Sequence, residues 1–148
     1  VPVKEEILQV VELMKDYASG KSNTMVVEVD EETVWCDPGS FQLIMRNLLS
    51  NALKFTTGGS ITLRAHQSNG TTTLEVTDTG CGMEAHLVEE LFKPGWKEVQ
   101  RGTAGERGTG LGLSLVAEHV ARNQGSVTAE SQPGKGMTVK VKLPSHKI

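Results

Sequence analysis

Two hydrophobic periodicities alternate along this chain, and they limit its possible folds more than any other feature. Apolar residues recur at helical spacing in three segments, 2–19, 37–55 and 109–123. Period-two alternation, which is typical of strands, marks five other stretches: 25–29, 61–65, 74–78, 127–129 and 139–143. Three long helices and five or six strands, mostly linked by hairpins, predict an α+β fold in which the helices pack on one face of a mixed sheet.

Short signals at the segment ends refine this prediction. Asp37-Pro38 is a helix N-cap pattern, and Asn69-Gly70 is a strong signal for a two-residue hairpin turn. We expect a short extended piece at 33–36 to pair with the strand at 25–29, and a short helix at 84–91.

The composition fits one globular domain and excludes several classes of protein. The chain has 148 residues, of which 37% are hydrophobic and 22% charged, so it can bury a core without disulfides or metals. Its formal net charge of −3 argues against nucleic-acid binding, which needs a basic face. No run approaches the roughly 20 apolar residues of a membrane span, and the first residues lack a signal-peptide layout. Cys36 and Cys81 match no metal-ligand spacing, so we expect a reducing, cytoplasmic setting without direct membrane contact.

Glycines cluster between Gly80 and Gly112, where eight of the 16 fall, and this indicates closely approaching backbone or a loop that moves.

Two short patterns resemble phosphate-binding motifs but lack the secondary structure that those motifs require. Gly20-Lys21-Ser22 resembles the end of a P-loop but follows a helix, so we expect a helix stop with a solvated lysine. Gly80, Gly82 and Ala85 match a dinucleotide fingerprint, but their strand belongs to a hairpin and no βαβ unit follows.

Three stretches of the chain together form a better candidate for a nucleotide site. Asn47 and Asn51 share one face of the second helix, with Lys54 close by. Amide oxygens suit Mg²⁺ and a lysine suits phosphate, although a solvated polar stripe explains these three residues as well. Asp78 ends a strand, where it can cap the following loop or accept a hydrogen bond from a base amine. The glycines of 108–112 open a helix, whose N-terminus favours anions.

Four stretches in this order resemble the N, first glycine, F and second glycine boxes of bacterial sensor histidine kinases: 47–56 (NLLSNALKFT), 78–83 (DTGCGM), 91–94 (LFKP) and 108–113 (GTGLGL). One box alone is a weak signal, whereas four in order are specific, and the similarity covers nearly the whole chain. The resemblance implies the two-layer Bergerat ATP-binding sandwich with a mostly antiparallel sheet. It also implies binding of Mg-ATP and transfer of the γ-phosphate to a histidine on a separate domain.

The resemblance gives roles to individual residues. Asn51 would be the main Mg²⁺ ligand with Asn47 beside it, Lys54 would approach the phosphates, and these three would form the catalytic set. Asp78 would receive the adenine amine, and Thr138 would bond a water in the adenine pocket. The residues implied to bind ATP are Asn47, Asn51, Lys54, Phe55, Asp78, Gly80, Gly82, Met83, Phe92, Arg107, Gly108, Thr109, Gly110, Leu111, Gly112, Leu113 and Thr138.

The resemblance also implies a mobile lid and several partners. The ATP lid would span 93–107, anchored by Phe92, with basic residues that can meet the phosphates. The partners would be the protein's own dimerisation and histidine-phosphotransfer domain and a response regulator receiver domain, within a homodimeric full-length protein. None of the four histidines lies in a phosphoacceptor context, so we expect surface or packing roles for His66, His86, His119 and His146.

Two other functions remain open at this point. One is an ATP-driven conformational module, as in gyrase, mismatch-repair or chaperone ATPases. Those ATPases usually carry an acidic residue, which activates water, where this chain has Asn47, and an amide is a poor general base. The other is a nucleotide-sensing module without catalysis.

Overall fold

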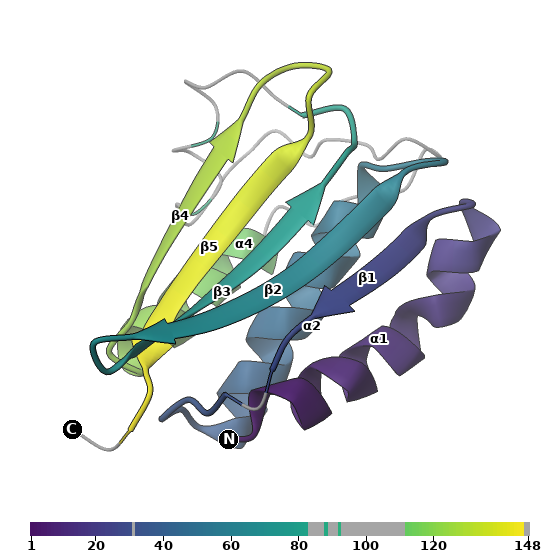
Figure 1. Cartoon of the computed structure of the whole chain (residues 1–148). Coiled ribbons are helices and arrows are strands. Elements are labelled where there is room, and N and C mark those ends of the chain that lie inside the picture. The colour runs from purple at the N-terminus through teal and green to yellow at the C-terminus, as the bar shows by residue number, and fades with distance from the viewer. Residues whose placement is uncertain (31, 83–87, 89–91, 93–111, 147–148) are drawn as a thin grey trace.

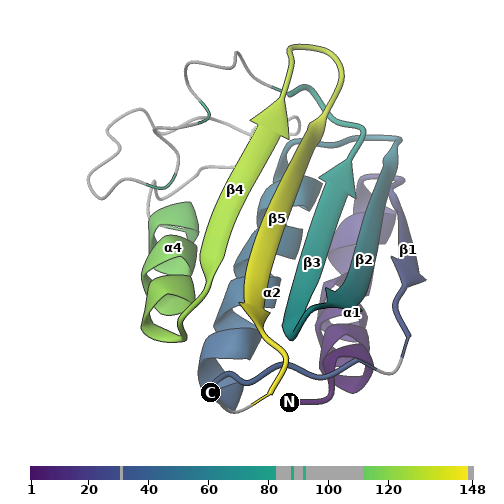
Figure 2. The ribbon, with the colours of Figure 1, turned by 60° about the vertical axis from the view of Figure 1, so that its left-hand side comes forward.

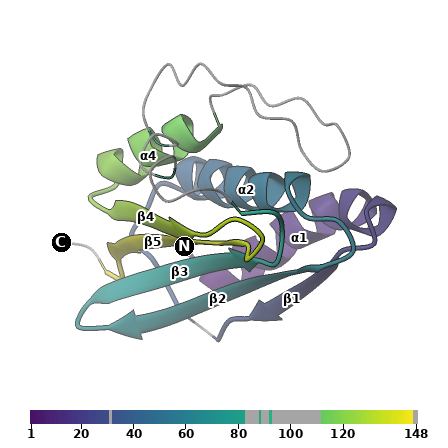
Figure 3. The ribbon, with the colours of Figure 1, turned by 90° about the horizontal axis from the view of Figure 1, so that it is seen from above.

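In the part of the chain that the structure describes, three helices lie against one face of a five-stranded sheet (Figure 1). This computed structural model describes residues 1–30, 32–82, 88, 92 and 112–146. The elements are α1 (Val3–Gly20), β1 (Thr24–Glu28), α2 (Pro38–Lys54), β2 (Ser60–Ser68), β3 (Thr71–Asp78), α4 (Gly112–Arg122), β4 (Ser126–Ser131) and β5 (Met137–Pro144). The helices form one layer and the sheet the other (Figures 2 and 3), which confirms the predicted two-layer α+β sandwich.

Local signals define the ends of several elements as predicted. A carboxylate oxygen of Asp37 accepts a hydrogen bond from the backbone N–H of Ser40 at 2.8 Å, and Pro38 is the first residue of α2. Asn69 and Gly70 have φ angles of 53° and 78°. Both therefore occupy the left-handed region that a two-residue turn between antiparallel strands requires. Of the predicted helix at 84–91, the structure describes only Val88, which is helical and buried. The rest of that helix and the start of the third helix at 109–111 lie outside the described residues.

One predicted strand pairing is wrong. The strands are ordered β1-β2-β3-β5-β4, and β1 pairs in parallel with β2, so that Thr24 lies opposite Ser60. Segment 33–36 does not pair with β1. Its Thr33 forms an isolated bridge with Pro2, and its neighbour Val34 is buried. Burial of that side chain holds the segment across the end of the sheet, where its backbone bonds to the N-terminus and to the end of β5.

Helix α2 is the central helix of the core. It lies between α1 and α4 in the helix layer (Figure 3) and contacts both. Its buried residues are Ser40, Phe41, Ile44, Met45, Leu48, Leu49, Ala52 and Leu53. All of them except Ser40 belong to one apolar cluster with inward-facing sheet residues such as Ile61, Leu63, Leu74, Val76, Val139 and Val141. None of the described helices combines the length and the apolar content that a membrane span needs.

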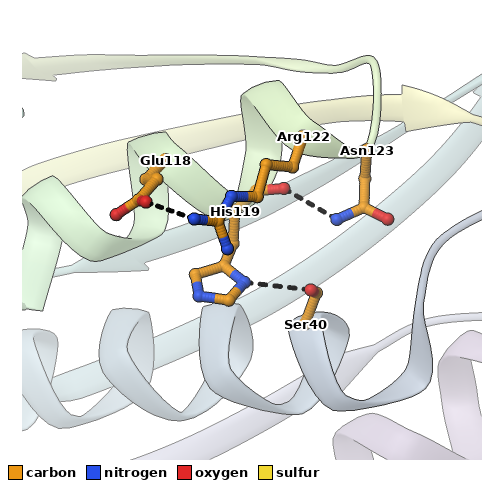
Figure 4. Close-up of polar contacts among 5 residues, drawn as sticks. All are labelled: Ser40, Glu118, His119, Arg122 and Asn123. Carbon is orange, nitrogen blue, oxygen red and sulfur yellow. Dashed lines mark hydrogen bonds and ion pairs between the residues drawn. The ribbon is translucent and has the colours of Figure 1, made fainter.

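Polar contacts fix α4 against the first turn of α2 (Figure 4). The imidazole Nδ1 of His119 lies 2.9 Å from the Ser40 hydroxyl oxygen, across the two helices. Asn123, just after α4, donates from its side-chain amide to the backbone carbonyl of His119 at 2.8 Å. The side-chain oxygen of Asn123 accepts from the backbone N–H of Asp37 at 2.9 Å. The contact with Ser40 confirms the packing role expected of His119.

Candidate functional site

The polar face of α2 carries Asn47, Asn51 and Lys54. All three residues are half-buried, whereas the residues that pack into the core lie on the other side of the helix. The side-chain nitrogen of Asn47 donates to the backbone carbonyl of Leu43 at 2.7 Å, which leaves its side-chain oxygen as the outward acceptor. The ammonium of Lys54 lies 4.9 Å from the centre of the Phe55 ring, within cation–π range. The helix therefore presents two amides and a cation in a row, partly shielded from water.

Asp78 ends β3 as a buried carboxylate, only 7% exposed. One of its oxygens accepts hydrogen bonds from the backbone N–H groups of Gly80, at 2.9 Å, and Met137, at 3.2 Å. Burial raises the pKa of the carboxyl group, and these two hydrogen bonds partly oppose the rise. Asp78 thus caps the following turn, one of the two roles expected of it. No described residue donates to its second oxygen, which leaves that atom available to a ligand.

Glycines bring three backbone segments together beside Asp78. A methyl group on Gly80 would collide with the carbonyl oxygen of Phe55, at the end of α2. Gly136 has a φ of +80°, and a methyl group there would collide with the carbonyl oxygen of Asp78. The backbone N–H of Cys81 also donates to the carbonyl of Phe55 at 3.1 Å. The turn after β3 is therefore packed directly on the end of α2, which brings Asp78 to the same end of the molecule as Lys54.

The side chain of Thr138 does not join this group, contrary to the expectation from the sequence. Thr138 pairs with Thr77 across β3 and β5, and their hydroxyl oxygens lie 3.1 Å apart. Successive residues of a strand point to opposite faces of the sheet. Thr77 and Thr138 therefore lie on the face opposite Asp78, whose cross-strand partner is Met137. The hydroxyl of Thr138 and the carboxylate of Asp78 therefore belong to opposite faces of the sheet.

Three other residues expected in the site contact parts of the chain other than Asp78 and Lys54. Phe92 is half-buried and packs against the core, and Leu113 is buried within it. Gly82 has a φ of +63° and lies against the backbone of Gln132. The residues that lie outside the described part of the chain are Met83, Arg107, Gly108, Thr109, Gly110 and Leu111, together with the rest of the expected lid at 93–107.

Sequence reasoning missed two buried polar residues near this site, Lys21 and Asn23. Lys21 was expected to be solvated, but it is only 7% exposed, and its ammonium donates to the backbone carbonyls of Leu53 and Lys54, both at 2.8 Å. Carbonyls at a helix C-terminus lack partners within the helix, so they attract such a donor. The local sequence carries no signal for this contact because it depends on how α1 and α2 pack together.

The remaining features of the described residues do not compete with this site. Among them, no group of three or more His, Cys, Asp or Glu side chains could hold a metal ion. Cys36 and Cys81 are both free thiols, and burial raises the pKa of Cys36 to about 11. An open groove lies at the opposite end of β3 from Asp78, lined by residues that include Gly70, Thr71 and Lys142.

Comparisons with known proteins agree on one family. Residues 36–147 match the model described as "Histidine kinase-, DNA gyrase B-, and HSP90-like ATPase". Over 120 residues, which are 80% of this chain and 20% of the relative, the sequence is 40% identical to the histidine protein kinase DivJ of Caulobacter vibrioides. It is 32% identical to the sensor histidine kinase YclK of Bacillus subtilis over 97% of this chain and 31% of that protein. The chain therefore spans less than a third of either relative.

Solved structures give the same result for the fold. The mycobacterial sensor histidine kinase MprB superposes with a TM-score of 0.84 over 100% of this chain and 97% of that one, at 24% identity. Full-length ShkA, solved in complex with AMPPNP, superposes with a TM-score of 0.83 at 28% identity, over 100% of this chain and 31% of that one. The fold is thus that of a kinase catalytic domain, the Bergerat sandwich implied by the four boxes.

Proposed function

This chain belongs to the family of histidine kinase-, DNA gyrase B- and HSP90-like ATPases, and we propose that it is the ATP-binding catalytic domain of a sensor histidine kinase. In this role it binds Mg-ATP and presents the γ-phosphate to a histidine on a separate dimerisation domain. The named relatives are histidine kinases, and the match to two of them covers most of this chain. They are much longer than this chain, which fits a domain that works within a larger protein.

The observation that carries the proposal is the meeting of two unlike groups at one end of the molecule. The polar face of α2 offers Asn47, Asn51 and Lys54, which suit a metal-bound polyphosphate. The turn after β3 offers Asp78, a buried carboxylate with one oxygen committed to the backbone, which suits the amine of an adenine. The packing of Gly80 on Phe55 joins the two groups. In ShkA, a chain of the same fold was solved with an ATP analogue.

The donor set of α2 fits Mg²⁺. Carboxamide oxygens are hard ligands of the kind that Mg²⁺ accepts, together with phosphate oxygens and water. The Asn47 side-chain nitrogen is held by Leu43, so its oxygen is the atom that remains for a metal or a metal-bound water. Asn51 follows one turn later on the same face. When bound, Mg²⁺ supplies charge neutralisation on the phosphates, while Asn47 and Asn51 hold their amide oxygens toward it and Lys54 adds a positive charge.

Phosphoryl transfer needs little covalent chemistry from such a domain, because positioning and charge neutralisation do most of the work. The side chains of this chain would orient the adenine and the triphosphate, and the acceptor histidine would come from the dimerisation domain. We further propose that 93–107 form the lid over the phosphates, that 108–113 contribute backbone N–H groups, and that the full-length protein is a homodimer that signals to a response regulator.

Labelled ATP tests the proposal directly. The chain is incubated with Mg²⁺, γ-labelled ATP and the histidine-bearing two-helix domain of its own full-length protein. We expect label on that domain in an acid-labile, base-stable form, which is typical of phosphohistidine. Asn51→Ala should abolish the transfer because it removes the main metal ligand, whereas Gln9→Ala, which removes an exposed amide on α1, should leave it intact.

Two results would contradict the kinase assignment. Rapid release of free phosphate by the chain alone, without label on the helical domain, would favour an ATP-driven conformational module. Tight binding of Mg-ATP with neither transfer nor hydrolysis would favour a nucleotide sensor.

A further inference from the structure

Lys21 is a buried cation in the connection between α1 and β1, outside the part of the chain that matches the family model. Its ammonium donates to the last two carbonyls of α2, those of Leu53 and Lys54, at 2.8 Å each. The carboxyl end of a helix carries a partial negative charge, so a buried ammonium is stabilised there. The ring of Tyr17 lies 5.7 Å from the same ammonium and covers it with an aromatic face.

Asn23 extends this contact along the segment that follows α2. Its side-chain nitrogen donates to the carbonyl of Thr56 at 2.7 Å, and its side-chain oxygen accepts from the N–H of Gly59 at 3.0 Å. The carbonyl of Lys21 accepts from the N–H of Gly58 at 2.9 Å. Residues 21–23 therefore hold the segment 53–59 from one side, through both side-chain and backbone groups.

The turn after β3 contacts the same segment through other groups. The carbonyl of Phe55 accepts from the N–H of Cys81 at 3.1 Å, and Gly80 packs directly on Phe55 and Thr56. Lys54 is thus fixed at its own carbonyl by Lys21, and its neighbour Phe55 is fixed by the turn that begins at Asp78. A shift of the end of α2 would move the Lys54 side chain relative to Asp78.

We propose that Lys21 is a positioning residue for the nucleotide site, which acts through the carboxyl end of α2. This inference rests on the proposed function, because it assumes that Lys54 meets the phosphates. Removal of the ammonium takes one donor from the part-buried carbonyl of Lys54 and one from the buried carbonyl of Leu53, which keeps the backbone N–H of Thr56 at 3.3 Å. Loss of such hydrogen bonds is costly. The end of α2 then moves toward other donors, and Lys54 moves with it. Binding of the phosphates should suffer more than binding of the adenosine part, which Asp78 recognises.

The test compares two ligands and two methionine variants. Dissociation constants for AMP-PNP with Mg²⁺ and for adenosine are measured by calorimetry on wild type, Lys21→Met and Lys15→Met. Lys15 is the matched control, because it lies on α1 with 59% of its side chain exposed, in an ion pair with Glu12. We expect Lys21→Met to weaken AMP-PNP by about tenfold, since small displacements of charged groups have effects of this order. Adenosine should change less than twofold, and Lys15→Met should match wild type for both ligands.

A purely structural role for Lys21 predicts a different pattern. If Lys21→Met only lowers the folded fraction, both ligands weaken by the same factor, and the inference is wrong. Equal affinities in wild type and Lys21→Met also overturn it. Lys21→Arg, which restores a cation, should recover most of the lost AMP-PNP affinity, and failure to recover any of it counts against the inference. If wild type itself does not bind AMP-PNP, the proposed function fails, and this result is distinct from the others.

A wild-type measurement decides the matter if Lys21→Met does not fold. The ammonium signal of Lys21 is followed by NMR in protein labelled with ¹⁵N-lysine. We expect this signal to shift on saturation with AMP-PNP and Mg²⁺ but to stay within line width with adenosine. An unchanged signal with AMP-PNP would mean that the end of α2 and Lys21 are not coupled to the phosphates.

Discussion

Replacement of Asp78 with asparagine tests base recognition by a change of one atom. The oxygen that accepts from the N–H groups of Gly80 and Met137, at 2.9 and 3.2 Å, has a counterpart in the asparagine side chain. The turn should therefore keep its shape. The second carboxylate oxygen, to which no described residue donates, becomes an amide nitrogen. If the adenine amine donates to that atom, two donors will face each other in the variant.

The expected loss follows from the burial of the site. Asp78 is 7% exposed, so a ligand amine that loses its acceptor there has little access to water. Leaving such a group unpaired costs about 1–3 kcal/mol, which corresponds to about a 5- to 150-fold rise in the dissociation constant of AMP-PNP. Inosine triphosphate carries a carbonyl where adenine carries the amine, and the asparagine amide can donate to it. The preference for the adenine nucleotide should therefore shrink or reverse.

Calorimetry with both nucleotides measures this effect on wild type, Asp78→Asn and Asp16→Asn. Asp16 is an exposed residue of α1, so its variant makes the same chemical change away from the site. Circular dichroism establishes that all three proteins are folded. Equal affinity of wild type and Asp78→Asn for AMP-PNP, with an unchanged ratio between the two nucleotides, would refute the role of Asp78 in recognising the base.

Three further predictions concern stability and reactivity. Burial raises the pKa of the Asp78 carboxyl above its ordinary value of 3.8, so its protonated form stabilises the fold at low pH, and this contribution is lost as the pH rises through the raised pKa. The free energy of unfolding of Asp78→Asn relative to wild type should therefore grow with pH above about 4. A difference in urea unfolding that is constant with pH would contradict this. We expect Gly134→Ala to cost about 1–2 kcal/mol, because Gly134 has a positive φ. Gly136→Ala should cost more, because Gly136 also has a positive φ and, unlike Gly134, packs against the carbonyl of Asp78. Equal losses in urea unfolding would be inconsistent with that contact. The thiol of Cys36 has a pKa of about 11, so at pH 8 it should react with a disulfide reagent about tenfold more slowly than the exposed thiol of Cys81. Similar rates in single-cysteine variants would show that Cys36 is not shielded.

Elements defined by local physics were predictable from the sequence. The N-cap at Asp37 and the left-handed turn at Asn69-Gly70 depend on a few neighbouring residues, and both are present as predicted. The spacing of Asn47 and Asn51 likewise fixed their common face on α2. The parallel pairing of β1 with β2 was not predictable in this way, because it joins residues 24–28 to residues 60–64 across the whole of α2.

The face of the sheet on which Thr138 lies could be predicted from the alternation of apolar and polar residues in β5. Val139, Val141 and Leu143 are buried, so the residues between them point away from the helices. Thr138 is out of phase with this set, and Asp78 is in phase with the buried Leu74 and Val76 on β3. The period-two alternation of the two strands therefore assigns Thr138 and Asp78 to opposite faces of the sheet.

Burial of Lys21 was not readable from its neighbours in the sequence. A lysine after a helix-stopping glycine is usually solvated, and its burial here results from the packing of the α1–β1 connection on the end of α2. The burial of a charged residue such as Lys21 depends on the tertiary structure, and the residues next to it in the sequence do not predict it.

Mapping of the nucleotide on the chain by NMR tests the central claim most directly. Backbone and side-chain amide signals are recorded while AMP-PNP is added in the presence of Mg²⁺. The account predicts that the largest shifts among the described residues occur at the side chains of Asn47 and Asn51 and at the backbone of 78–82. Shifts confined to the groove at the other end of β3, around Gly70, Thr71 and Lys142, or no shifts at millimolar nucleotide, would contradict it.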